Sequence, residues 1–84
     1  MIASDQIRAA RNALRWSVDE LARRSGVSPR TIKRMEASEG VPNSNVPNIA
    51  SLKAALESAG IEFIGTPDEA PGIRIHRVWD PKAK

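Results

Sequence analysis

The sequence contains no cysteine, no tyrosine and one phenylalanine, and His76 is its only histidine. The lack of cysteine excludes disulfides and thiolate chemistry. One histidine cannot build a metal site of several histidines within one chain, and no glycine-rich phosphate loop or paired acids in a plausible cleft are recognisable. We therefore expect no metal, no cofactor and no enzymatic activity.

Long apolar runs are absent too. No stretch approaches the roughly 20 apolar residues that a membrane-spanning helix needs, and the N-terminus has no signal-peptide core. We expect an intracellular protein that does not enter a membrane. The 84 residues leave room for one small domain with a modest core, to which a partner chain can add buried surface.

Positive charge is concentrated in one part of the chain. The net charge is +3, whereas residues 61–84 carry equal numbers of acidic and basic side chains and contribute nothing to it. Residues 23–34 contain no acid, and their basic residues are Arg23, Arg24, Arg30, Lys33 and Arg34. This distribution favours an anionic partner at the segment around residue 30.

Capping residues and apolar spacing predict four helices. Ser4 is expected to cap the first helix, and Ser17 the second, with Glu20 at capping-box spacing and Gly26 at its left-handed end. The third starts with Ser28 as cap and Pro29 in its first position. The fourth begins at Asn45 or a near neighbour, tolerates Pro47 in its first turn, and ends at Gly60.

After Gly60 the apolar residues alternate with polar ones, which is typical of β-strands. Ile61 and Phe63 belong to one predicted strand, Ile73 and Ile75 to another, and the Pro- and Gly-rich segment 65–72 is predicted to be the loop between them. The predicted organisation is a helical domain over 1–60, a strand extension over 61–79 and a disordered tail over 80–84.

The second and third helices have the spacing of a helix-turn-helix. With Val18 as the first of twenty positions, a small residue falls at position five, a glycine at position nine, and apolar residues at positions four, ten, fifteen and eighteen. These residues are Ala22, Gly26, Leu21, Val27, Ile32 and Met35. The alternative is a plain helical bundle with a solvated arginine face, but six matched positions and a basic, acid-free helix start favour DNA binding.

The segment ARRSGVSPRTIKRME resembles the helix-turn-helix of the lambda-repressor-like family, also called the Cro or XRE type. Residues 4–60 resemble its compact helical domain, and the tail resembles a small bacterial subgroup in which a strand pair follows the last helix. The resemblance implies a mainly α fold, double-stranded DNA as partner, and the bacterial cytoplasm as location. It also implies that the third helix reads the major groove from its first turns.

The residues that match the family's base-reading positions are Ser28, Pro29, Arg30, Lys33 and Arg34. Arg30 and Arg34 share one helix face, and each is expected to contact a guanine through two hydrogen bonds. The expected phosphate contacts are Ser17, Thr31, Asn43, Ser44 and Asn45; Thr31 has the alternative of bonding within its own helix. Val18 stands where many relatives have a phosphate-binding glutamine, so Arg15 and Arg24 are candidate substitutes for that contact.

Arg11 and Glu36 match positions at which many relatives have an ion pair between the first and third helices. We expect a largely buried pair that holds the reading helix at its angle. The alternative is a solvated pair that contributes little to stability.

A two-stranded hairpin is barely stable in water, and the family binds two-fold DNA sites as dimers. We therefore expect a homodimer interface formed by Ile61, Phe63, Ile73, Ile75 and Trp79. The alternative is that the strands fold back on their own helical domain.

The leading functional hypothesis is a dimeric repressor that reads an inverted-repeat operator. Three rivals remain: the antitoxin of a toxin–antitoxin pair, whose tail binds a toxin; an adaptor that has kept the fold and lost DNA binding; and, least favoured, an enzyme.

Overall fold

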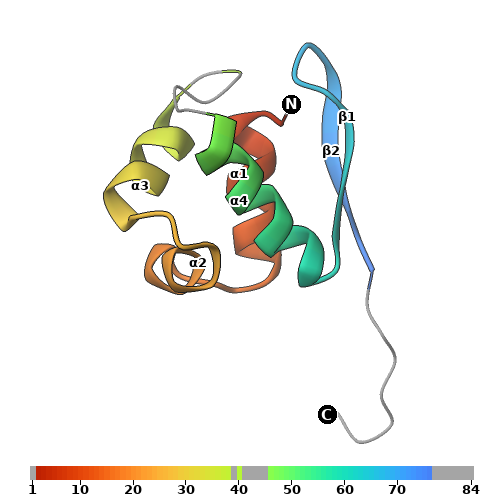
Figure 1. The fold of residues 1–84 in the computed structure, drawn as a ribbon. Helices are drawn as coiled ribbons and strands as arrows, with labels where there is room; N and C mark the ends of the chain where they lie inside the picture. The colour runs from red at the N-terminus through yellow and green to blue at the C-terminus, as the bar shows by residue number, and fades with distance from the viewer. Residues whose placement is uncertain (1, 39, 41–45, 77–84) are drawn as a thin grey trace, which may run out of the picture.

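The computed structural model describes residues 2–38, 40 and 46–76. Its four helices are α1 (Ser4–Ala13), α2 (Val18–Ser25), α3 (Pro29–Ala37) and α4 (Val46–Ser58). The strands β1 (Ile61–Thr66) and β2 (Glu69–Ile75) then form one antiparallel pair. The hairpin lies on one side of the helices, and α3 lies on the other (Figure 1). The predicted fold class, four helices followed by a strand pair, is confirmed.

Short local signals define α2 and α3. The Ser17 hydroxyl accepts the N–H of Glu20 at 3.0 Å, and Gly26 ends α2 with a φ of 78°. Ser28 caps α3 in the same way, and Pro29 occupies its first turn. These two caps, the left-handed glycine and the proline position were predicted correctly, because each depends only on neighbours along the chain.

The start of α1 differs from the prediction. Ala3, not Ser4, is the capping position, and the Gln6 side chain takes the capping role by accepting the Ala3 N–H at 2.7 Å. Ser4 turns into the interior instead, where its hydroxyl has no hydrogen-bond partner among the described residues. Its backbone N–H donates to the Gly40 carbonyl at 2.8 Å. Ser4 does not cap the helix because its side chain is buried in the fold. A capping preference depends only on nearby residues and does not predict this burial.

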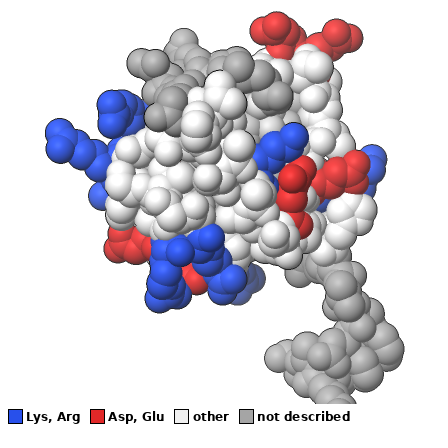
Figure 2. Space-filling model, in the orientation of Figure 1, with Lys and Arg blue, Asp and Glu red and all other residues white. Residues whose placement is uncertain are grey.

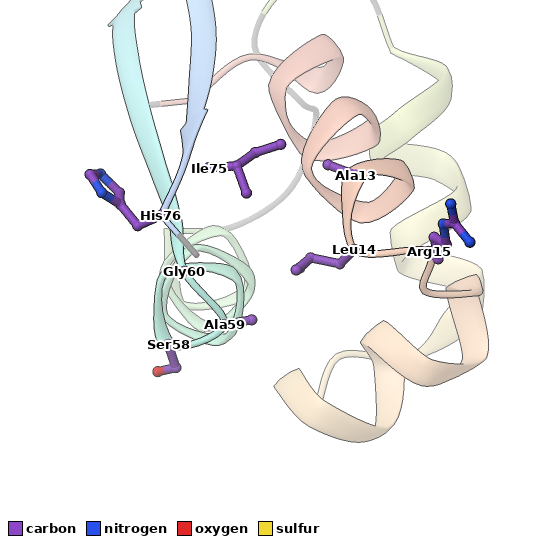
Figure 3. Close-up of a pocket in the computed structure, with 8 residues that line it drawn as sticks. All are labelled: Ala13, Leu14, Arg15, Ser58, Ala59, Gly60, Ile75 and His76. Carbon is purple, nitrogen blue, oxygen red and sulfur yellow. The ribbon is translucent and has the colours of Figure 1, made fainter. Parts of the chain in front are cut away.

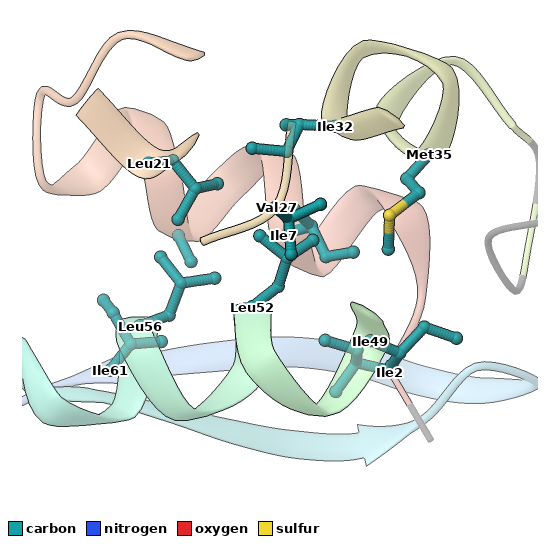
Figure 4. Packing of buried hydrophobic residues seen from close by; sticks show 11 residues of the cluster. Ile2, Ile7, Leu21, Val27, Ile32, Met35, Ile49, Leu52, Leu56 and Ile61 are labelled. Atoms are coloured by element: carbon teal, nitrogen blue, oxygen red, sulfur yellow. The ribbon is translucent and has the colours of Figure 1, made fainter. Parts of the chain in front are cut away.

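The core lies between the four helices, and the hairpin closes it on the side of α1 and α4 (Figure 4). Four of the motif's apolar positions are buried in it: Leu21, Val27, Ile32 and Met35. They face Ile49, Leu52 and Leu56 of α4, and Ile7 and Ala10 of α1. The apolar residues that identify the motif therefore also hold α2 and α3 against the rest of the domain.

The hairpin folds back on its own helical domain, which was the alternative arrangement. Ile61 is 2% exposed within the core, and Phe63 and Ile73 are half-buried against it. The Gln6 amide nitrogen donates to the carbonyls of Ile64 at 2.9 Å and Gly72 at 2.8 Å, joining α1 to both strands. The assignment of Ile61 to a dimer interface is corrected by this burial.

The predicted loop at 65–72 is also corrected. Most of this segment is strand, and only Pro67 and Asp68 lie between β1 and β2. The register shifts between Ile64 and Thr66, and Gly65 has a φ of 73°. A bulge of this kind lets strands continue through residues that a sequence pattern reads as turn formers. Trp79 and the predicted tail at 80–84 lie outside the described residues.

Candidate nucleic-acid interface

Helix α3 presents its predicted base-reading residues to solvent. Ser28, Pro29, Arg30, Lys33 and Arg34 are all exposed, while Ile32, Met35 and Glu36 form the buried side of the same helix. Arg30 and Arg34 stand one helical turn apart, as the spacing predicted. The helix is therefore anchored on one side and free on the other, which a helix entering the major groove requires. The individual base contacts stay predictions.

The cations of residues 23–34 do not all contribute equally to this surface. The Glu20 carboxylate bonds to Arg23 and to Arg24, whose Nε lies 2.5 Å from Oε2. These two bonds lower the pKa of Glu20, with the larger effect from Arg23. Within the described residues, no acidic side chain pairs with Arg30, Lys33 or Arg34. Among the cations of residues 23–34, those without an acidic partner in the described part of the chain are therefore the three on α3.

Over the described residues as a whole, positive charge is also greatest on the side of α3. Lys and Arg side chains gather over α3 and, mixed with acidic ones, around α2, whereas acidic side chains stand at the turn of the hairpin (Figure 2). On the hairpin, the Glu62 carboxylate accepts hydrogen bonds from His76 at 2.6 Å and Arg74 at 3.1 Å, and the bond from His76 contributes most to lowering its pKa. The field of the molecule therefore favours approach of an anion from the α2–α3 side.

The predicted phosphate contacts stay predictions, and the structure gives the surroundings of two of the side chains. Thr31 bonds within its own helix start, since its hydroxyl accepts from the Ser28 hydroxyl at 2.9 Å. The Ser17 side chain is exposed and caps α2 by accepting the Glu20 N–H. The phosphate contact expected from Ser17 and the backbone N–H groups that follow it stays a prediction. Asn43, Ser44 and Asn45 lie outside the described residues.

The predicted pair of Arg11 and Glu36 is present and largely buried. Arg11 Nε donates to Glu36 Oε2 at 2.7 Å, and Nη2 donates to Oε1 at 2.9 Å. The two side chains are 16% and 9% exposed. The hydrogen bonding of the Arg11 guanidinium to the Glu36 carboxylate raises the pKa of Arg11 above its ordinary value. This forked geometry fixes the end of α3 to α1 in both distance and orientation.

Two hydrogen bonds around this pair were not predicted. Arg8 donates to the backbone carbonyl of Glu36, and Arg11 Nη1 donates to the Trp16 carbonyl at 2.9 Å. Arg11 therefore joins α1, the turn before α2 and the end of α3. Arg8 and Arg11 are three residues apart on one helix, so they lie on the same face. This spacing indicates that both side chains can reach hydrogen-bond acceptors in the same neighbourhood. The carbonyls they reach depend on the tertiary fold.

A cation–π contact was also missed. Arg24 stacks on the Trp16 ring, with its Cζ 4.4 Å from the ring centroid. Together with the bond to Glu20, this stacking holds the Arg24 guanidinium against its own domain.

The fold and exposed basic helix define a helix-turn-helix of the class that binds DNA and regulates transcription. A family model described as helix-turn-helix matches residues 7–46, which run from within α1 to the first residue of α4. This segment belongs to the lambda-repressor-like, or Cro/C1-type, helix-turn-helix family. No curated protein and no solved structure matches the chain significantly.

Other kinds of site are absent from the part of the chain that the structure describes. No helix there is long and apolar enough to cross a membrane. No group of three or more His, Cys, Asp or Glu residues among the described residues could hold a metal ion.

Proposed function

We propose that this protein is a dimeric repressor that reads an inverted-repeat DNA operator through α3. The observation that carries the proposal is the free cationic face of α3: Arg30, Lys33 and Arg34 are exposed and have no acidic partner among the described residues. Arginine on such a face is suited to guanine, whose O6 and N7 accept two parallel hydrogen bonds. A two-fold dimer presents two such helices to a two-fold site.

Selection of bound duplexes from a random pool tests the proposal. We expect an inverted repeat whose half-sites lie about one helical turn, roughly 10 base pairs, apart or slightly more. Binding of the selected duplex should weaken steeply with salt, with a slope of several units in log K against log salt. Recovery of no preferred sequence, with no salt-dependent binding to any duplex, would rule out the operator-reading function and favour an adaptor.

The sequence predicted a dimer interface of five residues, and the dimer part of the proposal now depends mainly on one of them, Ile75. Ile75 is 40% exposed and is one of two large hydrophobic residues that remain exposed in the described chain. It faces Ala13 and Leu14 across an open groove of about 600 Å³ between α1 and the hairpin (Figure 3). We propose that a second copy covers this groove, with Ile75 of each chain near the centre of the interface.

Sedimentation of the full chain and of Ile75→Asp tests the dimer. The wild type is expected to sediment as a dimer, and the variant as a monomer with an unchanged circular dichroism spectrum, because a carboxylate in an apolar interface is costly. A truncation after Gly60 is not a clean test, because it removes Ile61 from the core. A dimeric Ile75→Asp protein would exclude the groove as the interface.

The antitoxin alternative depended on Trp79 and residues 80–84, which lie outside the described residues. No described feature favours it over operator binding, and we do not propose it.

A further inference from the structure

The Lys and Arg side chains of the described residues divide into two groups by their acidic partners. Salt bridges hold Arg8, Arg11, Arg23, Arg24 and Arg74. The basic residues without an acidic partner within residues 2–38, 40 and 46–76 are Arg15, Arg30, Lys33, Arg34 and Lys53. Three of these form the reading face of α3. Arg15 lies close to the motif along the chain, yet neither packing nor pairing explains it.

The backbone at Arg15 is strained. Its φ is 58°, in the left-handed region that glycine adopts readily and that arginine rarely does. Hydrogen bonds fix the turn on both sides of it: Arg15 N–H donates to the Asn12 carbonyl and Trp16 N–H to the Arg11 carbonyl, each at 3.0 Å. Arginine in a conformation that glycine adopts more readily is an outlier from which a role of the side chain can be hypothesised.

The Arg15 side chain is exposed and is directed away from Ile75, across the groove that both residues help to line (Figure 3). It stands two residues before Ser17, the cap of α2. Because Arg11 bonds both the Trp16 carbonyl and Glu36, this turn is tied to the end of α3. Within the described residues, Arg15 is therefore an unpaired guanidinium on a hydrogen-bonded turn next to the helix-turn-helix.

Arg24, the other candidate for the phosphate contact that Val18 cannot make, is already engaged. Its guanidinium bonds Glu20 and stacks on Trp16. Reaching a phosphate would break both interactions. Arg15 would break none among the described residues.

We propose that Arg15 binds a phosphate of the DNA backbone. This inference rests on the proposed DNA-binding function and adds a phosphate contact to that interface. The planar guanidinium matches phosphate oxygens with two parallel donors, and its long side chain reaches beyond the turn. The bound phosphate would position the protein on the duplex without selecting a sequence.

The test compares the salt dependence of duplex binding for the full-length wild type, Arg15→Gln and Arg24→Gln, measured by fluorescence anisotropy on one selected duplex. Both variants lose one positive charge from neighbouring parts of the motif. Arg15→Gln is expected to reduce the slope of log K against log salt by about 0.9 for each phosphate that is no longer neutralised. Binding at 0.1 M salt would then be about eightfold weaker for each such phosphate. Arg24→Gln should keep the wild-type slope.

A second variant separates binding from folding. Arg15→Gly relieves the left-handed backbone, so its melting temperature should stay at or above that of the wild type while its affinity for DNA falls as for Arg15→Gln. A wild-type slope in Arg15→Gln, or a lower melting temperature together with weaker binding in Arg15→Gly, overturns the inference. Failure of the wild type itself to bind any duplex overturns the proposed function instead.

Discussion

Replacing Glu36 by alanine is expected to reduce the free energy of unfolding by about 3–5 kcal/mol. The change strands the Arg11 guanidinium, which is 16% exposed and whose Nε and Nη2 both donate to the Glu36 carboxylate in the wild type. Removing one partner of a buried pair is this costly because the remaining charge is desolvated without compensation. A domain of this size has a total stability of only about 4–13 kcal/mol.

Thermal unfolding followed by circular dichroism measures the effect. A destabilisation of this size corresponds to a fall in Tm of about 12 °C or more. Glu20→Ala is the matched control, since Glu20 also bonds two arginines but does so at the surface, and it should lower the Tm far less. The double replacement Arg11→Met with Glu36→Met should recover much of the stability, because it leaves no charge stranded. An unchanged melting curve for Glu36→Ala would show that the pair contributes little.

The second large effect is expected on DNA recognition. The selected half-site and a variant in which one guanine is replaced should differ in their free energy of binding. Arg30→Ala and Arg34→Ala should each reduce this difference by about 1–3 kcal/mol. Both side chains are exposed on one face of α3, so their removal should leave the fold intact. Competition binding with single-base variants of the selected duplex measures the reduction at each position.

Lys33→Ala is the control for this experiment. Lys33 lies between the two arginines in the sequence and is also exposed, but a lysine is better suited to a phosphate or a flexible contact. We expect Lys33→Ala to weaken binding to all duplexes by a similar factor. If Arg30→Ala and Arg34→Ala also weakened all duplexes equally, the assignment of base reading to these residues would be wrong.

The parts of the fold that were predicted correctly depend on local chemistry. Ser17, Ser28, Pro29 and Gly26 act on neighbours within a few residues, so their positions alone locate α2, the turn and α3. The pair of Arg11 and Glu36 was predicted from resemblance to a known family, and its burial was expected as well. The structure adds the forked geometry and the bond from Arg11 to the Trp16 carbonyl.

The errors arose where interactions between distant residues prevail over local preference. Ser4 has a strong capping preference, yet burial made Gln6 the capping side chain, and Gln6 also hydrogen-bonds both strands of the hairpin. The two strands were predicted from their alternating apolar residues. This alternation does not say whether the apolar side packs on a second chain or on the helices of the same chain. The five cations of residues 23–34 were counted without Glu20, which lies just before them and pairs with two.

The sequence by itself determined that this chain has a helix-turn-helix with a basic second helix, because caps, a left-handed glycine and helical spacing act over short distances along the chain. Only the tertiary structure decided that the hairpin completes the same core, that Arg23 and Arg24 share the Glu20 carboxylate, and that Arg15 has no acidic partner among the described residues. Burial and charge pairing depend on which surfaces meet, and those surfaces are brought together by folding.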